Sequence, residues 1–101
     1  MHEDDVIIVE GKKDVRSLCE LGFENTIIPL SRRPLYKVVE DVARRGRRTH
    51  ILTDFDKRGK QLYRYLYHHL TRHGVKIDNR FREYLMRYTP VVMIENLANY
   101  C

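Results

Sequence analysis

Cysteine is scarce in this sequence, and it has no long apolar run. Of the 101 residues only Cys19 and Cys101 are cysteines. Cys19 falls on the apolar side of an expected helix, which predicts a buried thiol in a reducing compartment, whereas the terminal Cys101 carries no information. No apolar run approaches the roughly 20 residues that a membrane span needs, and the acidic start 1–5 has the wrong charge for a signal peptide. We therefore expect a cytoplasmic protein with no membrane partner.

The length and charge of the chain narrow its class further. A chain of 101 residues fits one domain, spanning 1–101, and its 43% of hydrophobic residues can form a real but small core. Lysine and arginine total 19 against 14 acidic residues, a net charge of +5. An excess of positive charge favours a polyanionic partner, and nucleic acid is the expected one.

Apolar runs alternate with helical patterns along the chain. The run 6–9 is Val-Ile-Ile-Val, which is typical of a strand buried on both faces. Strands are expected at 6–9, 26–30, 50–53, 75–77 and 91–94, and helices at 13–21, 34–46, 59–73 and around 81–88. This alternation predicts an α/β domain with right-handed crossovers. Its mainly parallel sheet would have four strands, or five if the last run joins it, with helices on both faces.

Acidic residues follow the ends of two expected strands. Glu10 directly follows the run 6–9, and Asp54 and Asp56 follow 50–53. Ligands of open parallel sheets bind beyond the carboxyl ends of the strands, and side chains two residues apart in extended chain point the same way. The three carboxylates should therefore meet in one cleft, where they would repel each other strongly. A divalent cation would remove that cost, and Mg²⁺ prefers such oxygen ligands.

Glycines and basic residues flank these acids. Gly11 and Gly59 are expected to let the backbone turn and to admit the close approach of a phosphate, and each leads into a helix N-terminus, which attracts phosphate. The loop after the second strand adds Arg32 and Arg33, at least one of which we expect to bind phosphate. The other flanking cations are Lys12, Lys13, Lys57, Arg58 and Lys60. An acidic centre with a basic rim is the arrangement expected where a metal ion and a polyanion bind together.

These motifs resemble those of the Toprim domain. Val-Glu-Gly at 9–11, followed by Asp-Phe-Asp at 54–56 and a glycine three residues later, is similar to the two signatures of that family. The resemblance runs from about 6 to 94, and it is strongest to the small stand-alone members and to the ribonuclease that matures ribosomal RNA. It implies the Toprim fold, a Rossmann-like three-layer sandwich.

The same resemblance implies roles for individual residues. Glu10 would act as the general acid or base. Asp54 and Asp56, with Glu10, would bind Mg²⁺, for which Mn²⁺ could substitute. Phe55 stands where many members of the family have proline.

Simpler interpretations compete at several of these positions. Asp56 could cap the helix that follows it. Asp14 could serve only the dipole of its own helix, so it and Glu95 are retained as accessory residues. The basic run 44–48 lies at an expected helix end, where cations are favourable without any ligand. The tyrosines of the expected helix 59–73 indicate packing or a homodimer contact more than base stacking.

Two functions stay open on the sequence alone. The first is an enzyme that cleaves phosphodiesters of RNA or DNA with Mg²⁺, in which Glu10 activates water or protonates the leaving oxygen. The second is a non-catalytic module that binds nucleic acid and recruits a partner of the primase, topoisomerase or RNA-processing type. Phosphoryl transfer on a small substrate is disfavoured, because haloacid-dehalogenase-type phosphatases and receiver domains need their acidic pair at the first strand.

Overall fold

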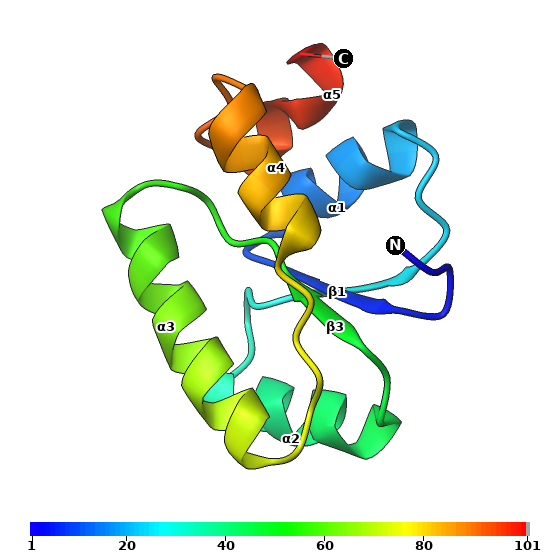
Figure 1. Ribbon diagram of the computed structural model, residues 1–101, viewed down its shortest axis with the longest axis vertical. Coiled ribbons are helices and arrows are strands. Elements are labelled where there is room, and N and C mark those ends of the chain that lie inside the picture. Colours follow the sequence, from blue (N-terminus) through cyan, green and yellow to red (C-terminus); the bar gives the residue numbers. More distant parts are fainter. Residues whose placement is uncertain (101) are drawn as a thin grey trace.

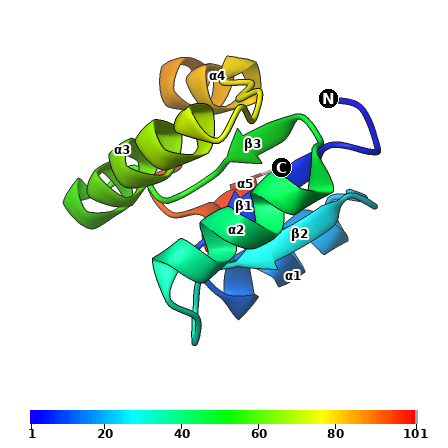
Figure 2. The same cartoon turned by 90° about the horizontal axis from the view of Figure 1, so that it is seen from below.

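A sheet of three parallel strands lies at the centre of the computed structural model, which describes residues 1–100; Cys101 lies outside the described residues. The strands are β1 (Val6–Val9), β2 (Thr26–Pro29) and β3 (Thr49–Ile51). They lie in the order β2-β1-β3, and β1 pairs in parallel with both neighbours (Figure 2). β1 takes the central place because its four apolar, β-branched residues are buried on both faces of the sheet.

Helices cover both faces of this sheet. They are α1 (Lys12–Glu20), α2 (Leu35–Arg45), α3 (Lys57–Arg72), α4 (Arg80–Tyr88), the 3-10 turn η1 (Ile94–Asn96) and α5 (Leu97–Tyr100). Figure 1 shows α1, α4 and α5 above the strands, α2 below them and α3 along the left side. None of the described helices combines the length and the apolar character needed to cross a membrane.

Alternation along β1 divides the core in two. Val6 and Ile8 belong to a buried cluster that includes the apolar stripes of α2 and α3. Ile7 and Val9 point the other way, into a cluster with α1, α4 and the C-terminal turns. Side chains of a strand alternate between its faces, so one four-residue run supplies both cores. The expected three-layer α/β arrangement is confirmed.

The expected fourth and fifth strands do not form within residues 1–100. The segment 75–77 makes a single parallel bridge, between Ile77 and Thr49, because the chain reaches the start of α4 only three residues later. The segment 91–94 is irregular and turns into η1. The backbone N–H of Ile94 donates a hydrogen bond to the carboxylate of Asp54 and not to a neighbouring strand. The sheet has three strands, and the prediction of four or five was wrong.

Cys19 is exposed, contrary to the prediction of a buried thiol. The inner face of α1 is set by Asp14, Ser17 and Leu18. The hydroxyl of Ser17 accepts a hydrogen bond from the backbone N–H of Ala98 at 3.0 Å. The C-terminal turns thus pack against a face of α1 that includes polar residues, which leaves the cysteine outside.

Candidate functional site

The ends of β1 and β3 bring Glu10 and Asp54 into contact. Neighbouring parallel strands end at the same edge of a sheet, so the residues that follow them lie side by side. Oε2 of Glu10 accepts a hydrogen bond from the backbone N–H of Asp54 at 2.8 Å. This bond fixes the direction of the Glu10 carboxylate and leaves Oε1 as the oxygen that a ligand would meet.

Asp54 is the most enclosed of the three predicted metal ligands, with 7% of its surface exposed. Its Oδ1 accepts a hydrogen bond from the backbone N–H of Ile94 at 2.8 Å. The residue is therefore oriented by a segment that lies 40 positions further along the chain. The C-terminal part of the protein closes one side of the site in this way.

Asp56 lies at the N-terminus of α3 and is exposed. Its Oδ1 accepts a hydrogen bond from the backbone N–H of Gly59 at 2.8 Å, so the capping interpretation is confirmed for this oxygen. A cap uses only one oxygen of the carboxylate. Oδ2 of Asp56 makes no hydrogen bond with the described residues, so the cap leaves one carboxylate oxygen free.

The accessory acids Asp14 and Glu95 lie close to this group. Asp14 is 5% exposed, and its Oδ2 accepts a hydrogen bond from the backbone N–H of Gly11 at 2.9 Å. Glu95, in η1, lies near enough for its negative charge to raise the pKa of Asp14 and of Asp54. Strands, a helix start and a C-terminal turn thus all contribute acids to one edge of the sheet.

The local environment disfavours the ionised forms of these acids. Burial raises the pKa of Glu10, and the charges of Asp54, Asp56 and Asp14 raise it further. Burial also raises the pKa of Asp54 and of Asp14, with neighbouring carboxylates adding to the effect. The hydrogen bonds from backbone N–H groups oppose these shifts without cancelling them. The site therefore brings together carboxylates that form no ion pair within residues 1–100 and that disfavour one another's ionised form.

The carboxylate oxygens at this site suit a hard cation that binds through only a few protein ligands. No three carboxylate, imidazole or thiol side chains within residues 1–100 form a ready-made metal cluster. Mg²⁺ commonly binds through one or two carboxylates, with water and substrate phosphate oxygens completing its shell. The free oxygens of Glu10, Asp54 and Asp56 meet that lower requirement.

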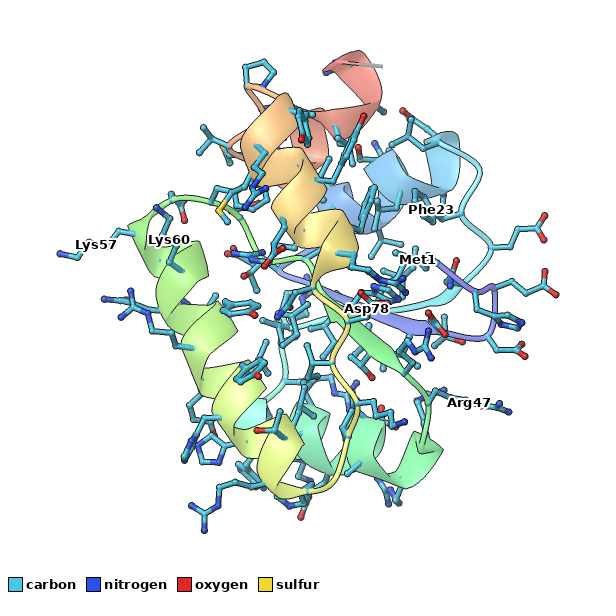
Figure 3. The ribbon with its side chains drawn as sticks, in the orientation of Figure 1. Met1, Phe23, Arg47, Lys57, Lys60 and Asp78 are labelled. Carbon is cyan, nitrogen blue, oxygen red and sulfur yellow. The ribbon has the colours of Figure 1, made fainter. Side chains whose placement is uncertain are left out.

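The predicted basic rim surrounds the acids. Its exposed members come from the first turns of α1 and α3, and they are Lys12, Lys13, Lys57, Arg58 and Lys60. Figure 3 shows Lys57 and Lys60 at the N-terminal end of α3, beside the loop that leaves β3. Cations at this end of α3 oppose its dipole, so helix stability does not explain them.

The two predicted glycines have different structural roles. A Cβ atom added at Gly11 would meet no atom within 4 Å, so the space above its backbone is open to a ligand. Its φ of −152° is an extended conformation that requires no glycine. A Cβ atom added at Gly59 would lie 2.0 Å from the backbone oxygen of Asp54. Gly59 is needed because α3 packs directly on the strand end, a reason that sequence analysis did not foresee.

The loop after β2 places its two arginines differently. The backbone N–H of Ser31 donates to the backbone carbonyl oxygen of Glu10 at 3.1 Å, which holds the loop beside the site. Arg33 forms an ion pair with Asp41 of α2 at 3.1 Å. Arg32 is exposed and adopts the left-handed conformation, with φ of 66°. Such strain in a residue other than glycine is concentrated at functional sites, so Arg32 is the better candidate for a phosphate contact.

Arg82 is the residue that sequence analysis missed. It comes from α4, is 5% exposed, and its guanidinium donates to the backbone oxygen of Thr53 at 2.6 Å. The guanidinium also lies over the rings of Phe55 and Tyr63, at 4.7 and 4.6 Å from their centroids. It therefore holds the end of β3 from behind the acids. One signal was available: Arg82 precedes the buried Leu85 by three residues, which places both on one helix face.

Comparison with known proteins identifies the family. The model of the Toprim domain matches residues 5–88, most of the chain. The chain belongs to the Toprim domain family. A UPF0292 protein of Methanocaldococcus jannaschii is 37% identical over 101 residues, covering 97% of this chain and 79% of that protein. A UPF0292 protein of Pyrococcus abyssi is 42% identical, covering 95% of this chain and 74% of that one.

A solved structure supports the same assignment. A putative protein from Aquifex aeolicus superposes with a TM-score of 0.83 at 27% sequence identity, covering 92% of this chain and 84% of that one. As a Toprim domain, the chain has a metal-dependent, nucleic-acid-related function in the general sense that the family has. The designation UPF0292 states neither a substrate nor a reaction, so these relatives support the family and not an activity.

Proposed function

We propose that this Toprim domain, spanning 1–101, is a Mg²⁺-dependent nuclease that cleaves phosphodiester bonds of RNA or DNA. The observation that carries the proposal is the convergence of Glu10 and Asp54, joined by a 2.8 Å hydrogen bond, in an acidic group where burial and neighbouring carboxylates raise the pKa of both residues. A divalent cation such as Mg²⁺ bound there supplies charge neutralisation and polarises a phosphate oxygen. Asp54 and Asp56 are the residues proposed to hold it, with Glu10.

The protein groups have separate tasks in this proposal. Glu10 is proposed to take a proton from water or to give one to the leaving oxygen. Its raised pKa suits this task, because a general acid or base works best when its pKa lies nearer the working pH. The open backbone at Gly11 and the exposed cations Lys12, Arg32 and Lys57 are proposed to position the phosphate chain.

The test is cleavage of a panel of structured RNA, single-stranded DNA and duplex DNA, with Mg²⁺ and with Mn²⁺. Glu10→Gln should lose cleavage by roughly 10²- to 10⁴-fold while nucleic-acid binding is kept. Asp54→Asn combined with Asp56→Asn should lose metal-dependent cleavage. Glu40→Gln, the same chemical change on an exposed position of α2, is the matched control. Full activity of the Glu10→Gln protein would contradict the proposed role of this residue.

A second function is favoured by one observation. The exposed cations around the acids would serve equally well a module that binds nucleic acid without cleaving it. Such a module would recruit a partner of the primase, topoisomerase or RNA-processing type. Binding of the panel with no cleavage under either metal, in the native protein and the double variant alike, would select this alternative.

A further inference from the structure

A pocket lies between α3 and α4, next to the acidic site. Its volume is about 290 Å³, and residues of both helices line it. Lys60 marks the end nearest the acids, since it follows Gly59, whose backbone packs on Asp54. Figure 3 shows Lys60 at the N-terminal end of α3, beside the loop from β3. A chain molecule with one unit at the acids could therefore place a neighbouring unit in this pocket.

The walls of the pocket are flat and partly apolar. Tyr63 contributes its ring, which stacks on that of Tyr67 with 5.9 Å between centroids and 27° between planes. The guanidinium of Arg82, also in the lining, lies over the Tyr63 ring at 4.6 Å from its centroid; it is buried and supports that ring from within. Met86 adds an apolar side chain that is 52% exposed. Aromatic rings and arginine planes are the groups on which unpaired bases stack.

One polar atom of the lining has no partner. Oδ1 of Asn79 is buried, and it makes no hydrogen bond within residues 1–100. Burial raises the pKa of Tyr63, and the Asn79 side chain, which also interacts with the Tyr63 hydroxyl, acts to lower it. This oxygen of Asn79 is enclosed by the protein, so it is part of the support of the pocket wall and not a contact offered to the ligand.

The rim of the pocket carries positive charge. Lys60 and Arg64 are four residues apart on α3, so they lie on one face of the helix, and both are exposed. Glu83 of α4 is the acid of the lining. Two exposed cations thus stand against one carboxylate at the rim, a balance that suits a phosphate-bearing ligand.

We propose that this pocket binds one unpaired nucleotide of a nucleic-acid strand whose neighbouring phosphate lies at Glu10 and Asp54. The inference rests on the proposed function and names the substrate class: single-stranded or locally unpaired RNA or DNA. The volume, near the lower limit of roughly 300 Å³ for small-ligand pockets, suits a single base. A base inside a duplex is stacked and paired, and it reaches such a pocket only after leaving the helix.

The first test measures binding without cleavage. A short fluorescein-labelled strand of mixed sequence, as RNA and as DNA, is compared with its fully paired duplex in Ca²⁺, with EDTA as a second condition. The single strand is expected to bind about tenfold tighter than the duplex, since stacking on Tyr63 is available only to unpaired bases. Equal affinity for strand and duplex would overturn the proposal.

Variants then locate the binding. Lys60→Gln with Arg64→Gln should weaken binding of the single strand about tenfold, and should lower the slope of log affinity against log salt by about 1.4 if both residues contact phosphates. Lys37→Gln with Arg44→Gln, the same charge change on exposed positions of α2, is the matched control. An equal loss in both double variants would show a general charge effect and would overturn the assignment to this pocket.

A direct readout covers the case in which a pocket variant folds poorly. Adenosine and cytidine 5′-monophosphates are titrated into the ¹⁵N-labelled native protein. Shifts are expected at Tyr63 and at the backbone and side-chain amides of Asn79. Shifts confined to α1 and α2 would place the nucleotide elsewhere and overturn the inference.

The pocket and the nuclease can fail separately. Selective single-strand binding without metal-dependent cleavage would keep the pocket and remove the nuclease. Metal-dependent cleavage of strand and duplex at equal rates, unchanged by the Lys60→Gln, Arg64→Gln protein, would keep the nuclease and remove the pocket.

Discussion

Two buried aspartates at opposite edges of the sheet have opposite electrostatic environments. Asp5, before β1, is 5% exposed and Asp54, after β3, is 7% exposed. Burial acts to raise the pKa of Asp5, but the hydrogen bond with His50 and further favourable contacts outweigh it, so the pKa of Asp5 is lowered. The pKa of Asp54 is raised by burial and by Asp56. Two aspartates with similarly small exposed fractions therefore have opposite pKa shifts, and their hydrogen-bond partners and charged neighbours contribute to the difference.

The partners of the two carboxylates explain the difference. Oδ2 of Asp5 lies 2.7 Å from Nε2 of His50, whose side chain is 2% exposed. Asp54 has a backbone N–H as its partner and other carboxylates around it. A carboxylate that serves stability is paired, whereas one poised for a ligand has charge left over. The amino edge of the sheet thus holds a paired carboxylate, whereas the carboxyl edge holds the acidic group at which we propose that a ligand binds.

The backbone shows the same contrast. At the amino edge, the turns after α1, α2 and α3 use Gly22, Gly46 and Gly74 with positive φ, where glycine costs little. At the carboxyl edge, among residues 1–100, the one positive φ outside glycine belongs to Arg32. Strain is therefore kept where the ligand is expected and relieved where it is not.

The largest effect is expected from Gly59→Ala at the carboxyl edge. The added Cβ would lie 2.0 Å from the backbone oxygen of Asp54, so α3 or the strand end must move. We expect a loss of at least about 3 kcal/mol in the free energy of unfolding, measured with urea. Gly11→Ala is the matched control, because its Cβ meets no atom within 4 Å; it should cost less than about 1 kcal/mol. Similar losses in both variants would refute the packing role of Gly59.

The second-largest loss of stability is expected from Asp5→Asn at the amino edge. Asp5→Asn removes the carboxylate from a buried contact with His50 and should destabilise the protein by about 2–3 kcal/mol at pH 7. The pKa of Asp5 is lowered from 3.8, so its contribution is present above pH 3.8 and is lost as pH falls through the pKa of the folded state. Urea unfolding at a series of pH values checks this. A penalty that keeps growing as the pH falls below 3.8 would contradict the pairing.

Asp54→Asn, at the carboxyl edge, should increase the free energy of unfolding, whereas Asp5→Asn should decrease it. Its pKa is raised from 3.8, so protonation favours the folded state, and stability is lost as pH rises through the folded pKa. Without divalent metal, the variant should be about 1 kcal/mol more stable than the native protein at pH 7 and no more stable below pH 3.8. Asparagine can still accept the hydrogen bond from Ile94, which isolates the effect of charge.

Magnesium sharpens the same comparison. If the ion binds at this edge, tenfold excess over its dissociation constant should stabilise the native protein by about 1.4 kcal/mol, and should stabilise Asp54→Asn much less. Thermal melts of both proteins, with and without Mg²⁺, measure the difference. Equal stabilisation of both by Mg²⁺ would argue against binding at Asp54.

The smallest effect is expected from Arg32→Gly. Glycine adopts a φ of 66° without the steric cost that other residues bear, and its greater freedom in the unfolded chain offsets part of the gain. We expect about 0.5 kcal/mol of stabilisation together with weaker binding of a nucleic-acid strand. Thermal melts and fluorescence anisotropy check the two parts. Weaker binding without any gain in stability would show that the Arg32 side chain binds the strand but that its backbone conformation is not strained.

The amino-acid sequence by itself determined the sheet centre and the position of the acids. The run 6–9 is apolar at every position, which predicts a strand buried on both faces, and Glu10 and Asp54 each follow the end of an expected strand. That these two strands are neighbours came from the tertiary structure. The family resemblance, which rests on those same residues, is confirmed. These features are local in origin, because periodicity and strand ends are written in consecutive residues. The roles of the site residues stay predictions.

Tertiary structure alone decided the rest. The segment 91–94 has the composition of a strand, yet Ile94 bonds to the carboxylate of Asp54. Arg82 supports the end of β3 through contacts with residues 29 positions away, and Gly59 is required by the backbone of Asp54. In each of these three cases, residues far apart in the sequence meet through a hydrogen bond or a close packing contact. Local pattern contains no information on such contacts, since packing brings these residues together only when the whole domain folds.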